Sequence, residues 1–240
     1  MRTNQMVYGQ CVAALLLALG STLALAQGQP TFAESQKANA QALRQYSWKS
    51  RTEIKLKGES KNVKVEQVRY DLNGKLQKTP IAGPPPAAPA AAAAPARGGR
   101  GGGRVKNKVI ENKKEEFGEM MKGLGQLVAS YGHLPPEKTQ AFAANATKGK
   151  GEGAMQGTAQ IQGANVLVEG DSMTMWVDPA SQMMRRVEIK TVYEGKPATV
   201  ITDYKSVPNG PTYMAQAMLT YPEKNVELTV DNYEYALSQP

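Results

Sequence analysis

Few residues in this 240-residue chain have the types and spacing that catalysis or metal binding requires. His133 is the only histidine and Cys11 the only cysteine, so a zinc ligand set or a cysteine-histidine nucleophile pair cannot be assembled. A serine triad would need His133 as its base, yet no Gly-x-Ser-x-Gly elbow presents a serine. The glycine-rich residues 151–157 differ by one position from a dinucleotide fingerprint and precede a predicted strand instead of a helix. We therefore expect no metal site, no cofactor and no enzymatic activity.

A basic, glycine-rich stretch is the second place where chemistry could reside. Residues 83–104 hold prolines, an alanine run and then Arg97, Arg100 and Arg104 among glycines. Such a composition cannot supply a packed face, which predicts a disordered insertion that acts as a tether. Two functional interpretations remain: contact of the three arginines with an anionic membrane surface, or binding of nucleic acid. No aromatic residues are interleaved with the arginines, which makes nucleic acid an unlikely partner.

The first residues have the features of a secretory signal peptide. Arg2 gives a positive start, residues 13–19 are apolar, and Ala24-Leu25-Ala26 is a cleavage-type sequence. Residues 1–26 are therefore predicted to be removed, with Cys11 among them. The mature chain would be a soluble periplasmic protein without disulfides, stabilised by its core. The formal charge of +8 favours an anionic partner surface.

The C-terminal third predicts an antiparallel meander. Apolar or β-branched residues alternate with polar ones along Val187, Ile189, Thr191 and Tyr193, which is the period of a strand with one wet face. Short turns such as Pro208-Asn209-Gly210-Pro211 permit only antiparallel neighbours. The predicted strands are 173–178, 182–194, 197–207, 211–221 and 225–235.

The first third predicts a helix followed by a meander of its own. Thr31 and Glu34 have capping-box spacing at the start of a helix over 29–45. Strands are then predicted at 46–57, 62–71 and 76–81, joined by glycine-containing turns.

The middle of the chain predicts an amphipathic helix over 106–131, in which Phe117, Leu124 and Tyr131 repeat every seven residues. Three glycines each lower its helix preference by about 1 kcal/mol, so the helix must be held by the surface that it covers. A short helix from Pro136 to Thr147, a loop over 148–157 and an extended segment over 158–169 complete the prediction.

One face of the long helix is apolar and rich in methionine, a side chain suited to irregular apolar ligands. Its members are Phe117, Met120, Met121, Leu124, Leu127 and Val128. An ordinary core stripe has the same pattern.

The order of the C-terminal turns resembles that of the periplasmic lipoprotein-carrier and outer-membrane lipoprotein-sorting (LolA/LolB-like) superfamily. The relevant segments are 175–179 with its Asp-Pro turn, 192–196 with its Gly-Lys turn, 203–210 with Asp-Tyr-Lys, and 226–232. The resemblance implies an α+β fold in which a strongly curved antiparallel sheet, a half-open barrel, is covered on its concave face by helices and holds acyl chains. It implies one such domain over residues 27–240, interrupted by 83–104. The six apolar helix residues would be the lid, with Trp176 contributing from the sheet.

Three functional hypotheses follow from these features. The first is a noncatalytic carrier of lipid or of an acylated protein, bound between sheet and lid. The second is a cell-envelope structural or interaction module with the same fold and a filled core. The third is nucleic-acid binding through the arginine-glycine segment.

Overall fold

The structure, a computed structural model, describes residues 30–81, 103–132 and 135–238, without the side chains of 103–114, 132 and 136. The predicted signal peptide (1–26) and His133 lie outside the described residues. The same holds for the insertion predicted over 83–104, apart from its last two residues, which begin a helix.

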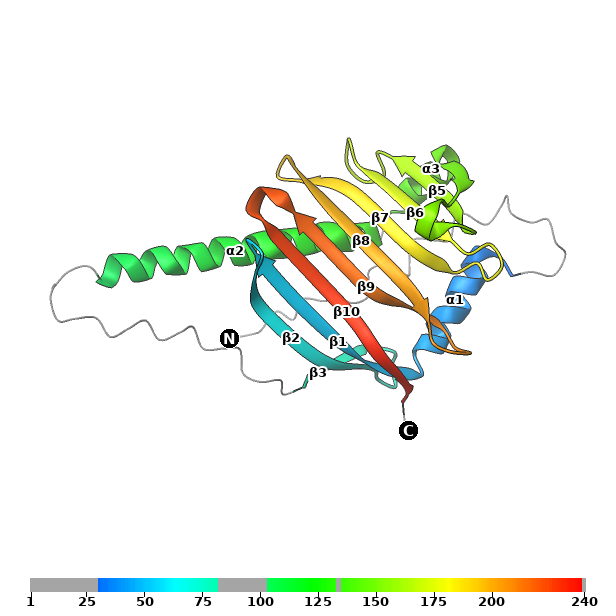
Figure 1. Cartoon of the computed structure of the whole chain (residues 1–240), viewed down its shortest axis with the longest axis horizontal. Coiled ribbons are helices and arrows are strands. Elements are labelled where there is room, and N and C mark those ends of the chain that lie inside the picture. Colours follow the sequence, from blue (N-terminus) through cyan, green and yellow to red (C-terminus); the bar gives the residue numbers. More distant parts are fainter. Residues whose placement is uncertain (1–29, 82–102, 133–134, 239–240) are drawn as a thin grey trace.

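Ten strands form one antiparallel sheet (Figure 1). The strands are β1 (Tyr46–Leu56), β2 (Glu59–Tyr70), β3 (Leu76–Pro80), β4 (Thr147–Lys150), β5 (Ala159–Ala164), β6 (Ser172–Val177), β7 (Met184–Tyr193), β8 (Lys196–Ser206), β9 (Thr212–Tyr221) and β10 (Val226–Leu237). Their order is β3-β2-β1-β10-β9-β8-β7-β6-β5-β4. The two predicted meanders are thus halves of a single sheet, joined where β1 pairs with β10.

Three α-helices accompany the sheet: α1 (Phe32–Leu43), α2 (Gly103–Gly132) and α3 (Pro136–Asn145). The predicted capping box of α1 is confirmed, since Thr31 and Glu34 each bond the other's backbone N–H. The long helix α2 crosses one face of the sheet, and its N-terminal end extends past the sheet (Figure 1). We call the face that α2 covers the inner face. The predicted fold class, α+β with an open, curved antiparallel sheet and covering helices, is confirmed.

The strand alternation that the sequence predicts is present in β7. Val187, Ile189 and Thr191 are buried on the inner face, whereas Glu188 and Lys190 are on the outer face. Among the described helices, none is both long and apolar enough to cross a membrane.

Two local predictions were wrong. Residues 148–157 were expected to be a loop, but Thr147–Lys150 form the edge strand β4 and Gly153–Met155 a short 3-10 helix, η1. All four residues of β4 are exposed, so no alternation of burial marked it as a strand. The extended segment expected over 158–169 ends at Ala164, because Asn165 adopts a left-handed conformation and a turn built around Asp171 follows.

Charged and amide side chains that pair across neighbouring strands on the outer face fix the register of the sheet. Arg186 donates two hydrogen bonds to Asp203 on the neighbouring strand, at 2.6 and 2.8 Å. Gln216 donates to Asp231 at 2.7 Å, and Arg51 lies 3.7 Å from the same carboxylate. A shift of one residue would break these pairs and turn the apolar residues outward, so both faces specify the same pairing.

Candidate functional site

Over residues 115–131, whose side chains are described, α2 is amphipathic and lies with its apolar side on the inner face. Leu124 is fully buried, and Met121 and Tyr131 are nearly so. Phe117, Met120, Leu127 and Val128 are half-buried and pack against the same core cluster. The six predicted lid residues are therefore brought together on one side of the helix.

The other predicted site residues lie elsewhere. Trp176 lies between Met175 and Val177 in β6, both of which are buried on the inner face, so Trp176 is on the outer face. Its paired residue on the neighbouring strand β7 is Arg186, which bonds Asp203 on the outer face. Arg97 and Arg100 are outside the described residues, and of Arg104 only the backbone, at the start of α2, is described.

Three methionines of the sheet belong to the same core cluster as the apolar side of α2, and the sequence reasoning did not select them. Met173, Met175 and Met184 are at most 2% exposed and belong to the same cluster as Leu124. The signal was present in the sequence Ser172–Val177, where every second residue is apolar, but Trp176 is apolar too and obscures the alternation. Unbranched thioether side chains adapt to irregular shapes, so this surface suits a flexible apolar partner.

At Gly123, α2 leaves no room for a side chain against the sheet. A Cβ atom there would lie 2.1 Å from the Tyr193 hydroxyl and 2.8 Å from the ring carbon that carries it. Tyr193 in turn packs edge-on against Tyr221, with ring centroids 5.7 Å apart. The absence of a side chain at Gly123 therefore sets the distance between helix and sheet.

A buried polar network anchors the C-terminal end of α2. The Tyr131 hydroxyl donates to Asp171 Oδ2 at 2.5 Å and lies 2.7 Å from the Thr191 hydroxyl. The Asp171 carboxylate also accepts the backbone N–H groups of Val166, Leu167 and Val168. Burial, and then the neighbouring carboxylate, raise the pKa of Tyr131 well above its ordinary value, so it stays a neutral donor. These contacts fix this end of α2 on the turn between β5 and β6.

The edges of the α2 contact are not sealed as its centre is. Four lid side chains and the sheet residues Ile54, Leu56 and Leu228 are only partly buried, although all pack against the core cluster. The contact is thus fully buried at Leu124 and partly exposed at these other residues.

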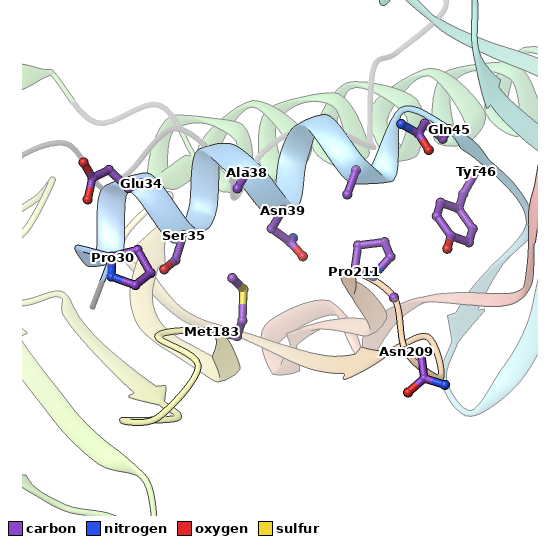
Figure 2. A pocket seen from close by; sticks show the side chains of 12 residues that line it. Pro30, Glu34, Ser35, Ala38, Asn39, Gln45, Tyr46, Met183, Asn209 and Pro211 are labelled. Carbon is purple, nitrogen blue, oxygen red and sulfur yellow. The ribbon is translucent and has the colours of Figure 1, made fainter. Parts of the chain in front are cut away.

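A groove of about 610 Å³ lies beside α1 (Figure 2). One wall is the helix, with Ser35, Ala38 and Asn39, and the other carries Met183 and Pro211 from two turns of the sheet. The Asn39 amide is already engaged with the backbone of Thr212 through two hydrogen bonds. The groove is wide open to solvent, so it is a weaker candidate for a ligand site than the inner face.

Two further hollows have different characters. A small apolar cavity of about 40 Å³ is enclosed by Phe32 of α1 and by residues of β5 and β6 that include Ile161 and Val177. A polar pocket of about 560 Å³ is lined by residues 154–156 and by the β7 to β10 strands, including Asp203, Asp231 and Tyr233. Within the described residues, no group of three or more histidine, cysteine, aspartate or glutamate side chains is placed to hold a metal ion.

Comparisons with known proteins do not assign this chain to a family. No protein-family profile matches the sequence, and no curated protein matches it. A solved structure of a LolA superfamily protein from Nitrosomonas europaea is 11% identical and covers 85% of this chain and 92% of its own, with a TM-score of 0.34.

The close approach at Gly123 predicts opposite effects for two glycine substitutions in the same helix. Gly123→Ala should lower the free energy of unfolding by about 1–3 kcal/mol, because the added methyl overlaps Tyr193. Gly118→Ala is the matched control, since an added Cβ there meets nothing within 4 Å. It should raise stability by up to about 1 kcal/mol through helix propensity. Urea unfolding followed by circular dichroism measures both, and equal effects would contradict the described contact.

The network at Tyr131 predicts that Tyr131→Phe destabilises the protein by about 1–3 kcal/mol, because a buried carboxylate loses a hydrogen-bond donor. The neighbouring Ser130 is exposed and bonds only the Gln126 carbonyl within α2. Ser130→Ala should therefore change stability by less than about 0.5 kcal/mol. The comparison uses chemical denaturation, and a Tyr131→Phe protein as stable as the Ser130→Ala protein would show that the network does not anchor the helix.

Proposed function

We propose that this protein is a noncatalytic, exported binder of acyl chains, which it holds between the inner face of the sheet and α2. The observation that supports this most is the margin of the helix contact. Phe117, Met120, Leu127 and Val128 are half-buried over a methionine-rich sheet surface, where an ordinary core contact would be closed. Continuous apolar surface that stays accessible is a usual feature of ligand sites.

The energetics favour a long hydrocarbon chain. Each methylene removed from water contributes about 0.8 kcal/mol, so a chain of about 14 methylenes gains on the order of 11 kcal/mol. The cost of displacing lid side chains offsets part of this gain. Each of them stabilises the closed state by about 1.5–3 kcal/mol when fully buried. Because the four marginal residues are only half-buried, displacing them costs less than displacing Leu124.

Localisation and partner belong to the same proposal. The signal-peptide features of residues 1–26 support export, and the periplasm is the compartment in which a soluble carrier would meet lipid or acylated proteins. The formal charge of +8 would bring the protein to anionic headgroups.

A second candidate, an envelope interaction module with a filled core, is favoured by one observation. Leu124, Met173 and Met175 are at most 1% exposed, so the centre of the helix contact is already packed. In this case the margin would be a surface feature and acyl chains would not bind.

Binding of an uncharged fluorescent polyene fatty-acid ester to the purified, processed protein distinguishes the two candidates. Met120→Glu should weaken binding at least tenfold, because it places a charge at the apolar margin of the helix. Gln126→Glu adds the same charge on the exposed side of α2 and should bind as the unmodified protein does. Mass spectrometry of an organic extract should also show copurified lipid. An empty extract together with no saturable binding would rule out the carrier and leave the filled module.

A further inference from the structure

The inner face changes from apolar to polar along its strands. One row of paired residues that crosses six strands is wholly apolar: Ile54, Leu228, Leu219, Val200, Ile189 and Met173. The next row contains two threonines: Thr52, Val230, Ala217, Thr202, Val187 and Met175. In the row after that, Ser50 is paired with Glu66 on one side and Asn232 on the other. Polarity therefore rises with each step away from the apolar row.

The side chains of this polar row are buried, which is unusual for their types. Glu66, Ser50 and Asn232 are 7%, 8% and 8% exposed. Tyr204 follows Val200 and Thr202 on the same face of β8 and packs against the core cluster. We call Ser50, Glu66, Asn232 and Tyr204 the polar row.

Hydrogen-bond partners account for only part of this row. Lys64 lies 2.5 Å from one Glu66 oxygen, so the pair carries no net charge. The Asn232 amide donates to the Met214 carbonyl at 3.0 Å, which leaves its oxygen as an acceptor. The Tyr204 hydroxyl is buried and has no hydrogen-bond partner among the described residues. A buried hydroxyl without a partner is costly and is seldom retained unless something else satisfies it.

We propose that the polar row holds the head of the acyl ligand, and that this head is uncharged and bears hydroxyl groups, as in a monoacylglycerol. This inference rests on the proposed function. A hydroxyl-bearing head can donate to the Asn232 oxygen and pair with Tyr204, with Glu66 two strands further along the row, while its chain lies on the apolar rows towards α2. A phosphate or carboxylate head would bring a negative charge against Glu66, whose own charge Lys64 only balances. The site therefore selects by head as well as by chain.

The fluorescence of Trp48 can report binding of the head. It lies two residues before Ser50 on the same face of β1 and is 8% exposed. Its ring stacks on Tyr235 at a centroid distance of 5.2 Å. The second tryptophan, Trp176, is on the outer face, so a Trp176→Phe background isolates the signal of Trp48.

The experiment titrates this background protein with three palmitoyl probes below their aggregation limits: the glycerol monoester, the methyl ester and the free acid. The glycerol ester should bind at least tenfold more tightly than the other two. Tyr204→Phe should remove most of this preference and leave methyl-ester binding unchanged. The substitution deletes an unpaired buried hydroxyl, so the variant should be at least as stable as its parent. Tyr233→Phe is the matched control, because Tyr233 follows Asn232 and lies on the opposite face of β10, and this variant should keep the preference.

The outcomes separate the two proposals. If all three probes bind equally, or if Tyr204→Phe keeps the preference for the glycerol ester, the assignment of the head is wrong while the acyl-chain site stands. If the free acid binds most tightly, the polar row holds an anionic head and the inference is overturned. If no probe binds, the proposed function fails, and the inference fails with it.

Discussion

The pairing of β1 with β10 is the constraint on which the rest of the structure depends. Every other strand pair in the sheet joins neighbours in the chain, whereas this pair brings the first strand beside the last. Its register places Ile54 beside Leu228 and Ser50 beside Asn232, so the inner faces of the two halves become one surface. Without this pair, each meander would expose half of an apolar face. The entropy cost of so distant a contact grows only slowly with chain length, so the residues between β3 and α2 add little to it.

Much of the fold follows from local signals in the sequence. The capping box at Thr31, the alternation in β7 and the short turns after β7 and β8 each state a local structure, and each element was found within a few residues of its predicted position. The edge strand β4 was missed because nothing in it is buried. The joining of the two meanders could not be predicted, because antiparallel pairing of distant strands leaves no local pattern.

The candidate site was predictable in part, for a similar reason. Helical periodicity identified the apolar side of α2, since a helix shows its faces in its spacing. Trp176 was assigned to the wrong face of the sheet because residues 173–177 are apolar on both faces, so the alternation does not choose between them. The Tyr131 and Asp171 contact and the polar row combine residues from distant segments. Only the completed sheet brings them together.

The character of α2 connects the packing of the protein to its proposed function. Three glycines make the helix intrinsically weak, by about 1 kcal/mol each, so its position depends on what it covers. One end is fixed by the buried Tyr131 hydroxyl, and at Gly123 the helix leaves no room for a side chain against Tyr193 of the sheet. Beyond that point, Phe117 and Met120 are half-buried, and the helix continues past the sheet (Figure 1). A ligand chain that takes the place of these side chains replaces one apolar contact with another, so the net cost of lifting this part of the helix is small. Under the proposed function, the same helix would close the sheet when no ligand is bound and would yield to a hydrocarbon chain while its anchored end stays in place.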